Sequence, residues 1–179
     1  MTEPDRRSTP DRTLSARTLL RRQFRHAHQL LDGAINGLPA EVIHRHPSVG
    51  SSPIGASFAQ IVVCEDLSIN GVLAAAIPLA LSTWAGRTGL SELPPLARTG
   101  DRRSWARRVR LDLARLRPYA DAVYASTDAY LANLPDEALD PTDGAAPASL
   151  LTAILLTVSM RRGEIACLTA LERESPMER

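Results

Sequence analysis

Apolar side chains recur at three- and four-residue steps along four stretches of the chain, which is the spacing of one face of an α-helix. The first stripe begins near Leu14 and comprises Leu20, Phe24, Ala27, Leu31, Ala34 and Leu38. Gly37 and Pro39 predict the end of this helix, because glycine favours the turn after a helix and proline cannot continue one. One further helical turn is expected over residues 40–43.

The second predicted helix begins at the pair Ser51-Ser52 and runs to about Gly71. Ser52 is the expected N-cap, and Pro53 would then lie in the first turn, where a proline is tolerated. The helical pattern resumes over residues 73–84. Pro78 inside that stretch should open a new turn or kink the helix.

The third and fourth helices are predicted over residues 103–133 and 148–172, with Pro118 bending the third. The stripe of the third consists of Val109, Leu113, Leu116, Ala120, Val123, Thr127 and Leu131. The expected inner face of the fourth consists of Leu150, Ile154, Thr157, Arg161, Glu164 and Leu168. Residues 86–100 and 135–147 contain several glycines and prolines and are predicted to be loops.

No stretch alternates apolar and polar residues with a period of two between turn residues, so no β-strand competes with these helices. Four long amphipathic segments joined by two long connections are typical of a four-helix bundle. We therefore predict one all-α domain over residues 13–173, a four-helix bundle with long crossover connections. Tails are expected at 1–12, which should be disordered, and at 174–179.

Composition excludes several function classes. The 21 basic and 20 acidic side chains give a net charge of +1, so we expect neither nucleic acid nor an anionic membrane surface as a partner. Glu65 and Asp66 interrupt the most hydrophobic region, and no membrane span of roughly 20 apolar residues is predicted. The charged N-terminus is unlike a signal peptide, and Cys64 and Cys167 need no disulfide framework. The expected location is therefore the cytoplasm.

Three segments resemble the DinB/YfiT-like family of helical bundles. SSPIGASFAQIVVCED, from residue 51, is similar to the family's Ile-Gly-x-x-x-x-His-x-x-x-x-Glu-Asp pattern. PYADAVYASTDAYLANLPDEALD, from residue 118, looks like its third helix and exit loop, and MRRGEIACLTALE, from residue 160, resembles its His-Arg-Gly-Glu/Gln-Ile run. The three follow one another in the family's order, and the resemblance implies a DinB-like bundle that is often a homodimer.

The resemblance also implies a place for a metal, which the residues here do not suit. Many members bind a divalent ion through a histidine on the second helix and two ligands spaced i, i+4 on the fourth, and some are thiol-dependent S-transferases or a mycothiol-dependent isomerase. The matching positions here are Gln60, Thr157 and Arg161. A neutral amide, a hydroxyl and a permanent cation make a poor ligand set. We therefore expect neither a metal nor another cofactor at this place.

Arg161 is the most informative substitution, because its place in the predicted inner face points it toward the bundle. A buried arginine needs a partner, and Glu65, Asp66 and Glu164 are the candidates. One interpretation is a structural ion pair that replaces the metal. The other is an anchor for a substrate carboxylate or phosphate, which arginine binds in a bidentate manner.

Further polar residues fall on or beside the predicted inner faces. Gln60 and Cys64 lie i, i+4 on the second helix, and together with Thr157 and Arg161 they are candidate substrate-binding residues, or else ordinary core contacts. His28 borders the inner stripe of the first helix. His28 and Glu65 are the candidate catalytic residues for proton transfer, the alternative for His28 being an inert hydrogen bond.

Two basic segments remain. His44 and His46 resemble a chelating pair, but no acidic or cysteine partner lies near them in sequence, and an ordinary loop is the favoured interpretation. Arginines at 102, 103, 107, 108, 110, 115 and 117 open the third helix. They are either a phosphate-binding face or, as the spread over several faces favours, a solvated helix surface.

The sequence thus predicts a DinB-like protein with a metal-free central cavity that acts on a small anionic metabolite by transferase, isomerase or cyclisation chemistry, in bacterial specialised metabolism by analogy. The first alternative is a non-catalytic ligand-binding or scaffold bundle. The second is a metal- and thiol-dependent S-transferase that takes its ligands from outside the family positions.

Overall fold

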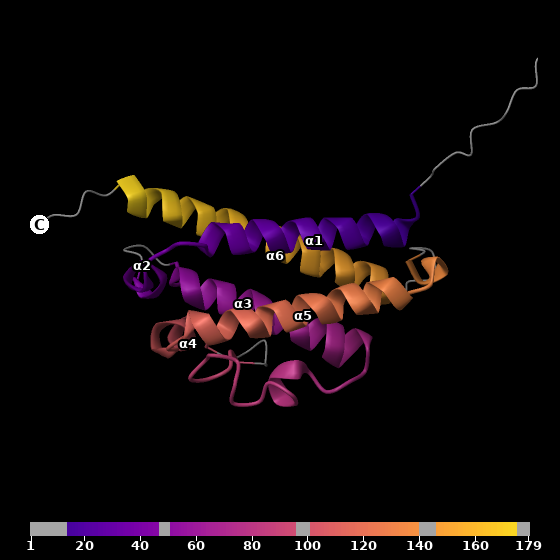
Figure 1. Ribbon diagram of the computed structural model, residues 1–179, viewed down its shortest axis with the longest axis horizontal. Coiled ribbons are helices and arrows are strands. Elements are labelled where there is room, and N and C mark those ends of the chain that lie inside the picture. The colour runs from indigo at the N-terminus through magenta and orange to yellow at the C-terminus, as the bar shows by residue number, and fades with distance from the viewer. Residues whose placement is uncertain (1–13, 47–50, 96–100, 140–145, 175–179) are drawn as a thin grey trace, which may run out of the picture.

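The computed structural model describes residues 14–46, 51–95, 101–139 and 146–174. Four long helices lie side by side along the length of the molecule: α1 (Ala16–Ile35), α3 (Ile54–Asp66), α5 (Leu113–Asn133) and α6 (Ala146–Glu174) (Figure 1). Two short helices, α2 (Ala40–His44) and α4 (Arg102–Arg108), lie together at one end. Within the described residues no strand forms, only an isolated bridge between Leu90 and Leu111. The all-α prediction is confirmed.

The bundle closes because each long helix has an apolar face. α1 packs against α5 and α6, and α3 packs against the same two helices. The stripe predicted for the third helix is buried at all positions but Leu113, which is half-buried. The first stripe likewise contributes Phe24, Ala27 and Leu31 to the core. α1 ends at Ile35, two residues before Gly37, whose positive φ of 73° is the conformation glycine adopts most readily.

The inner face of α6 differs from the predicted one by one position. The buried residues are Leu151, Ile154, Val158, Ile165 and Thr169. A shift of one residue turns a helix by about 100°, and it moves Thr157 to an exposed position and Arg161 to the border of the core. The prediction that Arg161 is removed from water is therefore wrong: its side chain is 43% exposed.

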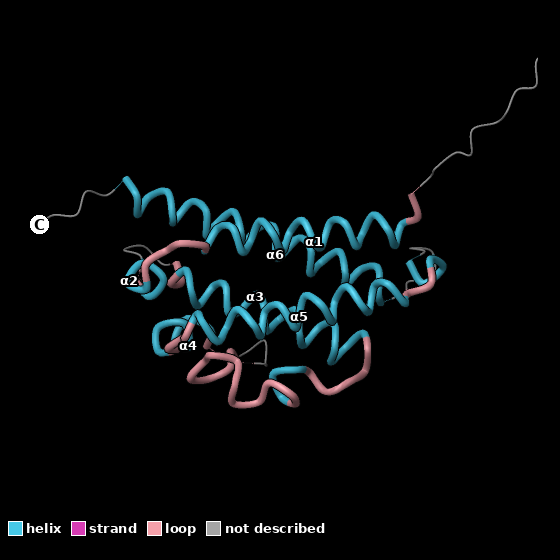
Figure 2. The backbone as a smooth tube through the Cα atoms, viewed as in Figure 1, coloured by secondary structure: helices cyan, strands magenta, loops and turns pink. Residues whose placement is uncertain are grey.

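Two predictions for the second helix need correction. α3 has Pro53 at its N-cap position with no side-chain cap, so the assignment of Ser52 as N-cap is wrong by one residue. The helix does not resume over 73–84. Instead a π-helical turn, Leu67–Leu73, ends α3, and Pro78 opens only a short 3-10 turn, Leu79–Leu81. The connection then runs along the outside of the bundle to α4 (Figure 2).

The predicted third helix is two helices, α4 and α5, with a break at residues 109–112. In the break the backbone pairs with another segment: Asp112 N–H donates to the Gly89 carbonyl at 2.8 Å, and Ser91 N–H donates to the Arg110 carbonyl at 2.9 Å. The Asp112 carboxylate then caps α5 by accepting from Ala114 N–H at 3.0 Å. Tertiary pairing and a new cap therefore override the local helical pattern.

The tails predicted at 1–12 and 174–179 lie outside the described residues, apart from the backbone of Glu174 at the end of α6. In the described part of the chain one stretch, Ile54–Leu73, is long and apolar enough to span a membrane by length and composition. Because 61% of its most apolar window is buried inside the protein, this stretch is a core helix of the bundle.

Gly89 supports the break between α4 and α5, and its replacement tests that pairing. Its φ is +80°, and a Cβ there would lie 2.6 Å from the Leu116 nitrogen and 2.7 Å from the Asp112 carbonyl oxygen. We expect Gly89→Ala to lower the free energy of unfolding by about 2–3 kcal/mol in urea denaturation. Gly33→Ala is the matched control, because nothing lies within 4 Å of its Cβ position in α1, and it should stabilise by about 0.5–1 kcal/mol. Equal effects of the two changes would contradict the pairing.

Candidate functional site

A buried carboxylate, Glu65, ties three helices together near the end of α3. Its side chain is 1% exposed. His28 on α1 places Nε2 3.0 Å from both carboxylate oxygens, and the Thr127 hydroxyl on α5 donates to Oε1 at 2.6 Å. A buried carboxylate is stable only when hydrogen-bond donors replace the lost water, which these two residues do. The two predicted catalytic residues, His28 and Glu65, are thus in direct contact.

Aromatic packing fixes the histidine ring. His28 stacks on Tyr124 with ring centroids 3.8 Å apart and planes 12° from parallel, and Phe24 packs at 5.9 Å. The Tyr124 hydroxyl donates to Asp32 at 3.4 Å. Burial raises the pKa of the Asp32 carboxyl, and the nearby Asp121 adds to the rise. A chain of polar groups therefore continues from Glu65 into α1, inside an apolar bundle.

A groove of about 140 Å³ lies between α3 and α6, beside this carboxylate. Its polar lining comes from Cys64, Glu65 and Ser68 on one side and from Thr157 on the other. Ile154 and Ala153 belong to its apolar wall. Glu65 is accordingly one of the residues that line this small groove, while His28 and Thr127 hold its carboxylate from α1 and α5.

Cys64 is not prepared as a nucleophile. Burial raises the pKa of its thiol above the ordinary value, and the positive charges of Arg102 and Arg161 oppose that shift without reversing it. A thiol with a raised pKa is protonated at neutral pH, whereas the thiolate is the reactive form. The groove therefore presents Cys64 as a neutral, polarisable side chain.

The three family metal positions do not form a ligand set. Thr157 donates its hydroxyl to the Ala153 carbonyl at 2.7 Å, and Arg161 donates to Glu164 at 2.7 Å, both within α6. Gln60 is half-buried and does not line the groove. An amide, a hydroxyl bonded to its own helix and a paired cation do not suit a divalent ion. Elsewhere in the described chain, no three His, Cys, Asp or Glu side chains gather where they could hold one.

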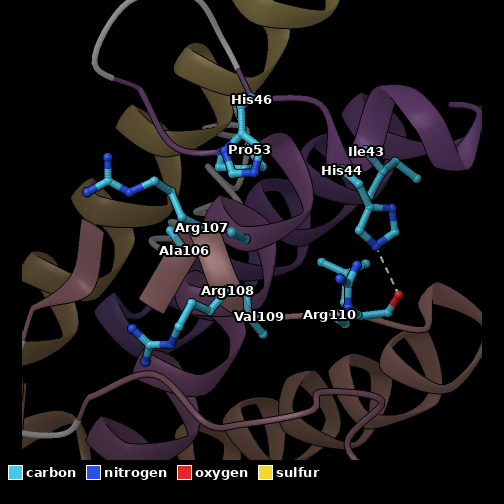
Figure 3. A pocket seen from close by; sticks show the side chains of 11 residues that line it. Ile43, His44, His46, Pro53, Ala106, Arg107, Arg108, Val109 and Arg110 are labelled. Carbon is cyan, nitrogen blue, oxygen red and sulfur yellow. Dashed lines mark hydrogen bonds between the residues drawn. The ribbon is translucent and has the colours of Figure 1, made fainter. Parts of the chain in front are cut away.

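His44, the last residue of α2, is likewise occupied. His44 places Nδ1 2.7 Å from the Ala40 carbonyl oxygen and Nε2 3.2 Å from that of Leu111. Both ring nitrogens thus face backbone carbonyl oxygens. His44 therefore has no free nitrogen for the chelating pair considered from the sequence. Together with His46 it lines a pocket separate from the groove (Figure 3).

The partners that hold Glu65 were not among the residues predicted from the sequence. Thr127 stood in the apolar stripe of the third helix, and a lone hydroxyl at a core position is a signal that a buried polar group lies opposite it. Tyr124 and Asp32 lie beside their predicted stripes and gave no such signal. Asp66 was a candidate partner for Arg161, but it accepts from the Tyr119 hydroxyl at 2.8 Å instead.

Comparison with known proteins agrees with this architecture. The sequence model of the DinB superfamily matches residues 23–159, from within α1 to within α6. No curated protein matches the chain.

Removing His28 tests whether Glu65 depends on it. We expect His28→Leu to lower the free energy of unfolding in urea by about 3–5 kcal/mol, because it leaves a buried carboxylate without its main donor. His26→Leu is the matched control: His26 is exposed two residues earlier on α1, and its loss should change stability by less than about 0.5 kcal/mol. The pair His28→Leu/Glu65→Leu should recover most of the loss. Equal losses of stability in His28→Leu and His26→Leu would show that the contact between His28 and Glu65 is unimportant.

The two cysteines should differ in reactivity. Cys167 is exposed on α6, whereas Cys64 is partly covered and has a raised pKa. Limited alkylation with iodoacetamide at neutral pH, read by peptide mass spectrometry, should modify Cys167 first. Faster modification of Cys64 would show an activated thiolate and restore thiol-based catalysis at the groove.

Proposed function

Because the chain belongs to the DinB superfamily, we propose that it is a metal-independent protein that binds a small anionic metabolite in the groove between α3 and α6 and transforms it. The observation that carries the proposal is the position of Glu65, a buried carboxylate that lines the groove and is held by His28 and Thr127. A buried carboxylate is costly to hold in an apolar bundle, and this one also borders the groove, where it can accept a hydrogen bond from a ligand.

The groove selects for two features of the ligand. At its inner wall the Glu65 carboxylate favours a hydrogen-bond donor, an O–H or N–H group, and the apolar side chains favour a short hydrocarbon body. Near its edge Arg161 is close enough to Cys64 to act on its pKa, and its half-exposed guanidinium is accessible to an anionic group. A small hydroxy acid, amino acid or phosphorylated alcohol combines these features.

The chemistry that fits this arrangement is proton transfer. Glu65 accepts a proton from the ligand's O–H or N–H group. His28 remains hydrogen-bonded to the same carboxylate and orients it for this transfer. Thr157 and Cys64 then contact the ligand body as polar, unreactive side chains. Such a proton transfer is compatible with transferase, isomerase or cyclisation chemistry.

One observation favours the non-catalytic alternative. Thr157 and Arg161 both already have partners on their own helix, Ala153 and Glu164, as expected if α6 has simply repaired the lost metal positions. In that case the protein is a ligand-binding or scaffold bundle, and the homodimer expected from the family is its main retained trait. The cytoplasmic location, like the homodimer, stays a prediction from the sequence.

Filling the groove tests the proposal. Purified protein is screened by thermal shift with hydroxy acids, amino acids and phosphorylated alcohols, each beside its neutral amide or free alcohol. A ligand at a hundred times its Kd stabilises by about 2.7 kcal/mol, roughly 5–10 °C for a chain of this length. The shift should disappear in Ala153→Phe, which fills the groove, and weaken in Arg161→Ala.

Ser159→Phe is the matched control for the added ring, because Ser159 is exposed on α6 and does not line the groove. It should keep the full thermal shift. A screen without any stabilising compound would favour the scaffold alternative. Stoichiometric zinc or nickel in the purified protein would favour the metal- and thiol-dependent transferase.

A further inference from the structure

A second, larger pocket lies at the other end of α3, away from the groove. It is enclosed by the end of α2, the first turn of α3, α4 and residues 109–111, and its volume is about 440 Å³ (Figure 3). An adjoining pocket of about 320 Å³ shares four wall residues with it, His46, Pro53, Ala106 and Arg107. We call the two together the basic pocket.

The described lining of the basic pocket carries positive charge and no carboxylate. Arg107, Arg108 and Arg110 line the larger part with His44 and His46, and Arg103 lines the adjoining part. Figure 3 shows Arg107 and Arg108 on one side of the space and Arg110, near His44, on the other. Like charges around one concavity repel one another, and an anion between them relieves the repulsion.

Only part of this charge is balanced within the protein. Arg108 is paired with Glu92 at 3.1 Å and with the Ser104 hydroxyl at 2.6 Å. The guanidinium groups of Arg107 and Arg110 make no hydrogen bond or ion pair with any residue that the structure describes. Two arginines at the pocket wall are therefore available to a ligand.

The start of α3 adds positive potential. Its first turn has no side-chain cap, and the positive end of its dipole lies at the pocket wall formed by Pro53 and Ala56. This potential strengthens an anion site that the arginines already define.

The side chains that line the basic pocket indicate the class of ligand. Two free arginines exceed what one carboxylate neutralises and match a phosphoryl group, whose oxygens accept bidentate hydrogen bonds from guanidinium. Ile43, Val109 and Leu111 add an apolar wall for an organic part. We propose that the basic pocket is a binding site for a small organic phosphate, distinct from the groove between α3 and α6.

The probe is phenyl phosphate, which joins one phosphoryl group to one apolar ring. Isothermal titration calorimetry at low salt should give a Kd below roughly 1 mM, with inorganic phosphate weaker and phenol not binding. Arg107→Ala and Arg110→Ala should each weaken phenyl phosphate about tenfold or more, because each removes one charge-assisted contact. Both side chains are exposed, so the variants should fold, and a melting curve checks this.

Two arginine variants serve as matched controls. Arg22→Ala removes an exposed charge from the N-terminal half of α1, and Arg161→Ala removes the charge beside the groove. Neither should change the Kd by more than about twofold. Backbone amide shifts in NMR spectra should locate the bound ring at Ile54 and Gly55, at the start of α3, whether or not a variant loses stability.

Three outcomes would overturn the site. The first is an unchanged Kd in the double variant Arg107→Ala/Arg110→Ala. The second is binding of phenol as tight as that of phenyl phosphate, which would leave only an apolar pocket. The third is a single-stranded oligonucleotide that binds more tightly than phenyl phosphate through the same arginines, which would make this face a nucleic-acid surface. A loss in Arg161→Ala alone would assign phosphate to the groove and support the proposed function instead.

Discussion

The structure depends on two adjacent carboxylates, Glu65 and Asp66, that end α3 inside an apolar bundle. Each is almost wholly buried. The two side chains have different hydrogen-bond partners. Glu65 is held by His28 and Thr127, which join α3 to α1 and α5. Asp66 accepts from Asn70, from the Tyr119 hydroxyl and from the N–H groups of Leu79 and Ala80, which fixes the start of the crossover connection. A buried carboxylate left unpaired is costly, so these donors determine both the helix packing and the path of the connection.

The fold class followed from the sequence because helical periodicity is a local property. Stripes such as Phe24 to Leu38 set both the number of long helices and most of their ends, and no β-pattern competed with them. The break between α4 and α5 could not be predicted, because it depends on pairing of residues 109–112 with 89–91, which are distant in sequence. Likewise, the π-helical turn after Asp66 leads into a segment whose Ala80 N–H donates to the Asp66 carboxylate. No local sequence pattern predicts that hydrogen bond.

The candidate site, like the fold, could be predicted from the sequence only in part. His28 and Glu65 stood out from sequence because each is a polar residue at the edge of, or within, an apolar stripe, and they are in contact. Arg161 was misplaced because the run of apolar residues in α6 allows two inner faces one residue apart, and only packing against α1 and α3 selects between them. The arginines of the basic pocket were noted in the sequence, where a solvated helix surface was the favoured interpretation. The concavity between α2, α3 and α4 could not be predicted, because a periodic pattern carries no information about shape.

The polarity of α3 explains why the two candidate sites lie apart and differ in charge. Carboxylates near the C-terminal half of a helix oppose its dipole, so Glu65 and Asp66 persist only with the donors that α1 and α5 supply. At the other end the dipole is positive, no side chain caps the first turn, and α4 adds uncompensated arginines. This polarity supports both proposals: a hydrogen-bond donor as the ligand group at the groove, and a phosphoryl group at the basic pocket. The one helix that both candidate sites share therefore presents opposite charge preferences at its two ends.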